Sequence, residues 1–134
     1  MRKSLFLALA GLLFAVPFVQ KPAMAYSLVG TWRGSVYLNG GIMYSSLVLE
    51  ANGQFNELDR SGSLMTEQSG GWQIIRGLLH LEVWDWQPKY QCLQTGCFPV
   101  REPPGSWYRI QWLSPNMARF QDVTFGGSIV YRRY

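Results

Sequence analysis

Histidine and cysteine are scarce in this chain of 134 residues, which contains one histidine and two cysteines. A zinc site is the main alternative to a disulfide for the two cysteines. His80, Cys92 and Cys97 offer three metal ligands at most, and their spacing does not suit a tetrahedral zinc site. A redox pair would ordinarily use Cys-x-x-Cys at the start of a helix, and that motif is missing. The sequence therefore predicts no metal centre, no redox pair and no cofactor.

Catalytic motifs are also missing, since the chain has no Gly-x-Ser-x-Gly elbow, no phosphate-cradling loop and no metal triad. His80 is the sole candidate general base, and alternation within "LLHLEVW" places it on one strand face with Glu82 and Trp84. Glu82 and Asp85 point to opposite faces of that strand, so they do not form a general acid and base pair. We therefore expect a protein that is not an enzyme.

After residue 25 the chain has only a small excess of positive charge. Arg2, Lys3 and Lys21 supply most of the formal charge of +4, and from Tyr26 onwards nine Lys and Arg residues face eight Asp and Glu residues. No basic run with interleaved aromatic residues occurs, so the sequence lacks the footprint of a nucleic-acid-binding protein. Apart from Lys89 the later cations are arginines, which suits stacking and forked hydrogen bonds.

The N-terminal segment has the pattern of a secretory signal peptide. Arg2 and Lys3 precede the apolar stretch "LFLALAGLLFAV", and the small residues "AMA" end at Ala25. The apolar run is shorter than the ~20 residues that a membrane span needs, and a proline interrupts it. We therefore expect residues 1–25 to be removed, and residues 26–134 to form a periplasmic or secreted domain without a membrane span.

The chain after residue 25 shows a hydrophobic period of two, and no stretch of a dozen residues has a helical repeat. In "TWRGSVYL", for example, Trp32 and Val36 fall on one face. Asn52-Gly53 joins two such runs and is the strongest short signal of a hairpin. Eight strands are expected, at residues 31–38, 43–50, 54–60, 65–75, 78–86, 107–113, 117–123 and 126–134.

Eight sequential antiparallel strands predict an all-β, up-and-down meander in a single domain. Closing the meander into a β-barrel removes the exposed strand edges, and an open sandwich is the alternative. A barrel of eight strands is either filled by side chains or holds one small ligand. Alternation along the strands does not choose between a filled and a hollow interior.

The stretch "LVGTWRG", at residues 28–34, resembles the Gly-x-Trp motif that begins the first strand of lipocalins and other calycins. The order of the expected strands extends this resemblance over residues 26–134, and the small exported lipocalin-like barrels of bacteria are the most similar members. In that family the tryptophan closes one barrel end, and an arginine late in the last strand packs across its ring. The resemblance implies these roles for Trp32 and for Arg132 or Arg133, and cation–π attraction gives the contact a physical reason.

The connection between the fifth and sixth strands is long and carries both cysteines. Export into an oxidising compartment favours a disulfide between Cys92 and Cys97, and Gly96 permits the tight geometry. A ring this small contributes only ~2 kcal/mol to stability, so the disulfide would shape the loop locally. Several prolines stiffen the rest of the connection, and long loops in compact domains are usually functional. We expect a stapled loop at the rim of one barrel end.

Aromatic residues near the strand ends and the long loop predict a ligand site, although they could equally fill the core. These residues are Trp72, Trp84, Trp86, Trp107, Tyr108 and Trp112. The predicted function is an exported, non-enzymatic binding protein that takes a small hydrophobic or aromatic ligand in or at the mouth of the barrel. The alternative is an envelope protein-interaction module, such as a protease inhibitor or an assembly factor, because Trp, Tyr and Arg are common at interface hot spots.

Overall fold

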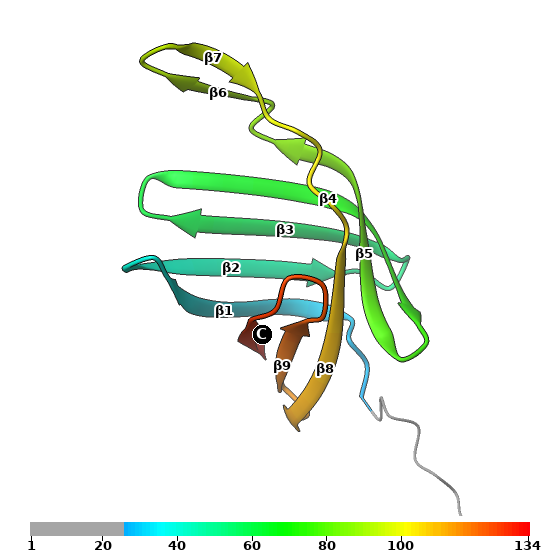
Figure 1. The fold of residues 1–134 in the computed structure, drawn as a ribbon. Helices are drawn as coiled ribbons and strands as arrows, with labels where there is room; N and C mark the ends of the chain where they lie inside the picture. The colour runs from blue at the N-terminus through cyan, green and yellow to red at the C-terminus, as the bar shows by residue number, and fades with distance from the viewer. Residues whose placement is uncertain (1–25) are drawn as a thin grey trace, which may run out of the picture.

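The computed structural model describes residues 26–134, so the predicted signal peptide, residues 1–25, lies outside the described residues. The described residues form ten antiparallel β-strands (Figure 1). They hold no helix that is long and apolar enough to cross a membrane. The strands are β1 (Gly30–Leu38), β2 (Gly41–Leu49), β3 (Gln54–Ser61), β4 (Leu64–Ile75), β5 (Leu78–Gln87), β6 (Tyr90–Leu93), β7 (Gly96–Pro99), β8 (Ser106–Ser114), β9 (Met117–Asp122) and β10 (Ser128–Arg133).

Eight of these strands form a closed barrel, which confirms the predicted up-and-down architecture. Neighbouring strands follow the order β1, β2, β3, β4, β5, β8, β9 and β10, and β10 pairs with β1 to close the sheet. In the closing pair Trp32 lies opposite Arg133, and Gly34 lies opposite Tyr131. The predicted Asn52-Gly53 turn joins β2 to β3, with Gly53 at a positive φ of 86° that glycine adopts readily.

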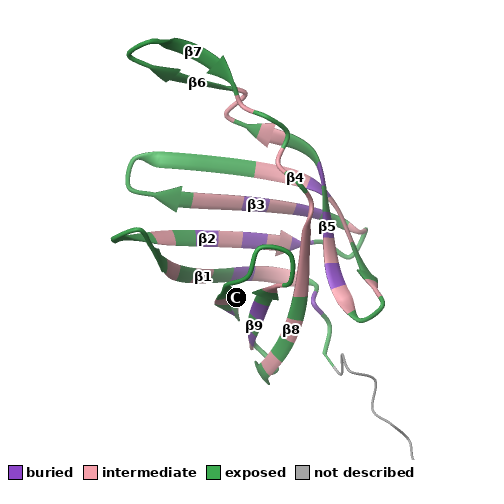
Figure 2. Cartoon of the chain, in the orientation of Figure 1, coloured by how far each residue is buried: buried purple, intermediate pink, exposed green. Residues whose placement is uncertain are grey.

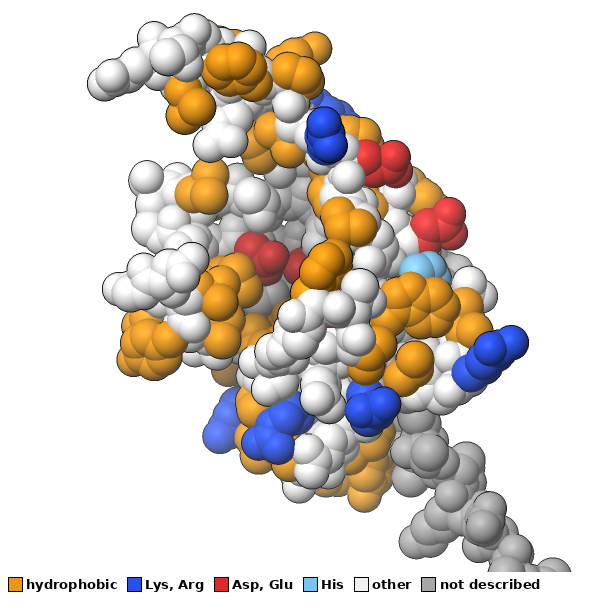
Figure 3. All heavy atoms as spheres, in the orientation of Figure 1, with side chains coloured by type: hydrophobic (Ala, Val, Ile, Leu, Met, Phe, Trp, Pro, Cys, Tyr) orange, Lys and Arg blue, Asp and Glu red, His pale blue; other side chains and the backbone are white. Residues whose placement is uncertain are grey.

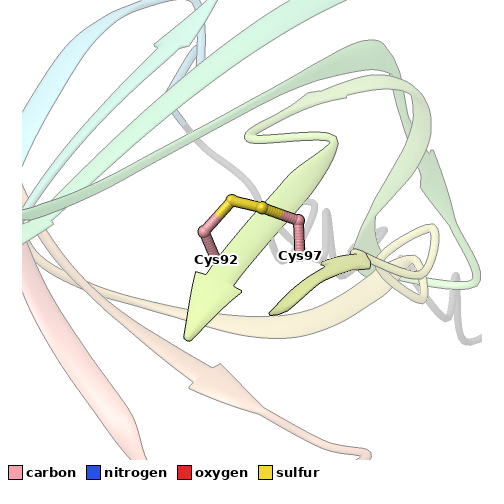
Figure 4. The surroundings of a disulfide bond; sticks show 2 residues. All are labelled: Cys92 and Cys97. Carbon is pink, nitrogen blue, oxygen red and sulfur yellow. A yellow bond between two sulfur atoms is a disulfide. The ribbon is translucent and has the colours of Figure 1, made fainter. Parts of the chain in front are cut away.

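The long connection contains a small hairpin that the sequence pattern did not reveal. Strands β6 and β7 pair with each other in a separate two-stranded sheet, which stands apart from the barrel wall in Figure 1. Cys92 lies opposite Cys97 in this sheet, and the two form the predicted disulfide (Figure 4). All eight residues of the two strands are exposed, so neither strand has a buried face that would produce an alternating pattern.

The core lies inside the barrel, where every second residue of each strand points. Buried residues recur along the strands in Figure 2, and alternation in β5 buries Leu79, Leu81 and Val83 as the sequence predicts. His80 and Glu82 lie on the opposite, outer face of the strand. Trp32 and Phe120 are the largest side chains that are fully buried. Aromatic burial therefore dominates the core.

A β-bulge interrupts the β4–β5 pairing between Ser69 and Gly70. Gly70 has no room for a side chain, because an added Cβ would lie 1.8 Å from the carbonyl oxygen of Glu82. The bulge accommodates Trp84 as an extra residue, so Trp86 comes to lie opposite Gln68 and packs against the core. Simple alternation would instead place Trp86 on the outer face with Trp84.

Candidate functional site

The barrel is filled at one end and hollow at the other. A cavity of about 310 Å³ opens where β1 ends and β10 begins, at the end of the barrel away from Trp32. Its volume lies at the lower limit of the ~300–1,000 Å³ that ligand pockets occupy. Its apolar walls include Val36, Leu38, Met43, Phe120 and Ile129, and its polar residues include Ser45, Glu57, Asp59, Tyr108, Asp122 and Tyr131.

Strand β3 carries the two carboxylates that matter most in this cavity. Alternation places Phe55, Glu57 and Asp59 on the inner face, and the buried Phe55 anchors that face in the core. Glu57 and Asp59 therefore project into the barrel one after the other, while Asn56 and Leu58 take the outer face. The inner face of β3 thus presents two acidic groups to the cavity.

Glu57 is 7% exposed, and its carboxylate is only partly satisfied. The Nε2 atom of Gln68 donates a hydrogen bond of 3.3 Å to Oε1. Within the described part of the chain, neither Oε2 of Glu57 nor Oδ1 of Asp59 has a hydrogen-bond partner. Burial raises the pKa of Glu57 to about 8, and Asp59 adds to this both through its charge and as an acceptor for the protonated carboxyl, while the hydrogen bond from Gln68 acts in the opposite direction. At pH 7 Glu57 is therefore mostly protonated.

Two tyrosines line the cavity beside these carboxylates. Burial raises the pKa of both Tyr108 and Tyr131, and the charge of Glu57 adds to the shift. Tyr131 shares a hydrogen bond of 2.8 Å with the hydroxyl of Ser45. The ring of Phe120 meets that of Tyr131 edge to face, with the centroids 4.8 Å apart. Both tyrosines stay neutral at physiological pH, and they offer the cavity hydroxyl groups and aromatic faces.

Positive charge lies on the outside of the barrel. Among residues 26–134, none of those that line the cavity is a lysine, an arginine or a histidine. Figure 3 shows acidic side chains within the hollow and basic side chains on the outer surface. The exposed arginines on outward positions of the barrel strands are Arg33, Arg60, Arg109, Arg119 and Arg132. The cavity therefore has a negative electrostatic character that no neighbouring cation cancels.

The opposite end of the barrel is sealed by Trp32, which is fully buried. Its Nε1 donates a hydrogen bond of 2.8 Å to the carbonyl oxygen of Leu28. Trp112 packs beside it, with the ring centroids 5.8 Å apart. Of the two candidate arginines it is Arg133 that lies over the Trp32 ring, whereas Arg132 points outwards and is exposed. The barrel interior at this end is filled by the rings of Trp32 and Trp112.

The six aromatic residues predicted to bind a ligand do not form one lining. Tyr108 lines the cavity, and Trp112 belongs to the sealed end. Trp72 lies opposite Leu81 on the inner face, and its Nε1 donates to the carbonyl oxygen of Glu50 over 2.8 Å. Trp86 packs at the edge of the core beneath the ammonium group of Lys89, which lies 3.5 Å from its ring centroid.

Trp84 and Trp107 face away from the barrel interior. Trp84 is 58% exposed, and its ring covers Gly71 on the outer surface. Trp107 stacks on His80, with the ring centroids 3.9 Å apart. His80 also lies 3.2 Å from the carbonyl oxygen of Ser106 through Nδ1. These contacts hold the start of β8, which follows the long connection, against β5. His80 is therefore a surface residue that packs against Trp107.

The long connection leaves β5 and returns into β8 at the end where the cavity opens. The indole of Trp86 holds the returning segment by donating to the carbonyl oxygen of Val100 over 3.3 Å. Gly105 then passes close to the backbone of Leu81. No residue of the connection is among those that line the cavity in the described structure. The connection therefore lies beside the cavity mouth, and the cavity walls come from the barrel strands and from Gly126 and Gly127 of the β9–β10 turn.

The acidic residues of the cavity escaped the sequence-based search for a site. That search weighed Glu82 and Asp85, which the structure places on the outside. The signal was present in "QFNELDR", because alternation from Phe55 puts Glu57 and Asp59 on the same inner face. Two carboxylates on the apolar face of a strand are unusual, since buried charges need partners.

Comparison of the sequence with models of known protein families and with curated proteins finds no match. The described residues also contain no group of three or more His, Cys, Asp or Glu side chains arranged to hold a metal ion. The fold and the cavity therefore carry the functional argument.

Proposed function

We propose that the protein is an exported, non-enzymatic binding protein that takes one small ligand, with a hydrophobic or aromatic part, into the open end of its barrel. The cavity of about 310 Å³ carries this proposal, because it combines apolar walls with a few convergent polar groups. The disulfide between Cys92 and Cys97 supports export to the periplasm or the exterior, where disulfides persist.

The arrangement at the sealed end supports a lipocalin-like identity. Trp32 begins the first barrel strand and Arg133 ends the last, and the guanidinium of Arg133 lies over the indole of Trp32. The up-and-down order of eight strands agrees with this. A barrel sealed at one end and open at the other is suited to holding a ligand reversibly.

Filling the cavity tests this proposal. Ile129 lines the cavity, and its neighbour Val130 faces outwards on the same strand. The neutral fluorophore N-phenyl-1-naphthylamine should bind the wild-type protein saturably, with a stoichiometry near one. Ile129→Trp should abolish this binding, whereas the matched variant Val130→Trp should retain it. Equal binding by the two variants would show that the probe sits elsewhere, and the cavity would lose its proposed role.

A second candidate function is binding to another protein of the cell envelope, as an inhibitor or an assembly factor. The β6–β7 hairpin favours it, because Tyr90 and Phe98 are 67% and 48% exposed on a segment that a disulfide makes rigid. Exposed aromatic residues on rigid elements are typical of interface hot spots. A partner that binds the wild-type protein but not Phe98→Ser, with fluorophore binding unchanged, would support this function.

A further inference from the structure

The chemistry of the cavity indicates which class of ligand it takes. Oε2 of Glu57 has no hydrogen-bond partner although the residue is 7% exposed, and Oδ1 of Asp59 is also without one. When Glu57 is ionised, both oxygens are buried acceptors that lack a donor, which is destabilising, and native proteins seldom keep such atoms without a use for them. Both residues line the cavity, and their two oxygens lie just behind its surface, so a ligand placed there reaches them once the carboxyl groups turn towards it.

The groups around Glu57 supply acceptors and neutral donors but no cation. β3 contributes Asp59 to the cavity, and other strands contribute the titratable groups of Tyr108, Asp122 and Tyr131, while Gln68 of β4 reaches Glu57 from outside the cavity lining. The cavity-facing residues of β2, Met43 and Ser45, are neutral, and those of β1, Val36 and Leu38, are apolar. The residues that line this part of the cavity therefore include no positively charged donor that could pair with the carboxylates.

The remaining walls describe the rest of the ligand. Towards the mouth the cavity is bounded by apolar side chains, among them Leu38, which is 50% exposed. Glu57 lies deep inside, next to the aromatic rings of Tyr108 and Tyr131. Aromatic faces attract cations, and apolar walls near the mouth suit a hydrocarbon body. The entrance thus combines apolar side chains with Asp122 and Ser128, and the bottom of the cavity is acidic and aromatic.

We propose that the cavity binds a monovalent organic cation, a primary amine or an amidine attached to an apolar body, whose N–H groups donate to Oε2 of Glu57 and Oδ1 of Asp59. This inference rests on the proposed function and specifies its ligand. An ammonium group has three donors, enough to satisfy both atoms at once. A divalent metal fits less well, because no three ligand side chains in residues 26–134 converge on one point.

Binding of such a cation is coupled to a proton. The pKa of Glu57 is raised to about 8 by burial and by the charge of Asp59, so Glu57 carries a proton at neutral pH. A bound cation favours the ionised carboxylate and lowers that pKa, so binding below about pH 8 releases a proton. Affinity for the amine should therefore rise with pH, by at most about tenfold per unit for one proton, and level off above the pKa.

Three probes with one carbon skeleton test the inference by calorimetry: 2-phenylethylamine, 2-phenylethanol and phenylacetate. The purified protein should bind the amine at least about tenfold more tightly than the alcohol, as expected for charge-assisted hydrogen bonds, and should bind the acid least. Glu57→Gln should remove most of this preference and the pH dependence of amine binding. Glu82→Gln, which changes an exposed glutamate on the outer face, should leave both unchanged.

The alternative outcomes separate the inference from the proposed function. Equal binding of the alcohol and the amine, with the neutral fluorophore still bound, would overturn the cation while leaving a cavity-binding protein. Binding of none of the probes, the fluorophore included, would overturn both. If the preference for the amine survives both in Glu57→Gln and in a second variant, Asp59→Asn, these carboxylates do not bind the amine. Stoichiometric binding of Ca²⁺ or Mg²⁺ that displaces the amine would replace the organic cation with a metal.

Discussion

The guanidinium carbon of Arg133 lies 4.9 Å from the ring centroid of Trp32, and this contact joins the last barrel strand to the first. The same guanidinium donates hydrogen bonds to the carbonyl oxygens of Ser27, Val29 and Pro115. It therefore ties together the segment before β1, the β8–β9 turn and β10. One arginine closes the end of the barrel opposite the cavity.

Arg133→Ala should lower the free energy of unfolding by about 2–3 kcal/mol, since it removes charged hydrogen bonds and a cation–π contact. The matched variant Arg132→Ala removes an exposed arginine from the next position and should change stability by less than about 0.5 kcal/mol. Urea denaturation followed by tryptophan fluorescence measures both. Equal effects of the two substitutions would show that the contact with Trp32 does not stabilise the barrel.

The ionisation of Glu57 should make the protein less stable as the pH rises. Its pKa is about 4.5 in the unfolded chain and about 8 in the folded protein, so between these values the folded state binds more protons than the unfolded state. The stabilisation that protonated Glu57 provides is therefore complete below about pH 4.5 and is lost progressively as the pH rises to about 8. Denaturation at a series of pH values measures this slope.

Glu57→Gln should flatten this part of the stability profile, because glutamine keeps the shape of the side chain and does not ionise. The variant should be more stable than the wild type above about pH 8, where the wild type buries a charged carboxylate. Wild-type stability that increases with pH over this range, or an unchanged slope in the variant, would contradict the assignment to Glu57.

The disulfide should order the β6–β7 hairpin without supporting the barrel. Strands β6 and β7 pair only with each other in the described structure, and all their residues are exposed. A double variant, Cys92→Ser with Cys97→Ser, should lose no more than ~2 kcal/mol of stability, because the closed ring is short. Limited proteolysis with mass spectrometry should show faster cleavage between Gln87 and Pro104. Loss of the folded barrel in this variant, or unchanged cleavage, would contradict the prediction.

The barrel could be predicted from local patterns because each strand carries its own evidence. Trp32 and Val36 alternate with polar residues in β1, and Asn52-Gly53 marks the turn between β2 and β3. Closure of the meander then follows from the need to pair two edge strands. The disulfide was predictable from the expected compartment and from the short spacing between the cysteines.

The candidate site was harder to predict, because its residues come from different strands. Trp86 turns inwards only because a bulge next to Gly70 changes the alternation of β5, and the glycines of β4 by themselves do not tell which residue of β5 is inserted. Glu57 meets Tyr108 and Tyr131 across the barrel interior through strands that are far apart in the sequence. Their meeting depends on the stagger of the barrel strands, which alternation does not specify.

By itself, the sequence determined that this chain forms an antiparallel up-and-down meander, because alternation and turn chemistry act over a few residues and appear directly in the order of the amino acids. Only the tertiary structure decided that Trp32 and Trp112 seal one end, that Trp84 and Trp107 lie on the outside, and that carboxylates line the other end. The physical reason is that the inner face of a barrel is assembled from all its strands at once. Register and shear therefore decide which inward side chains meet and whether space remains between them.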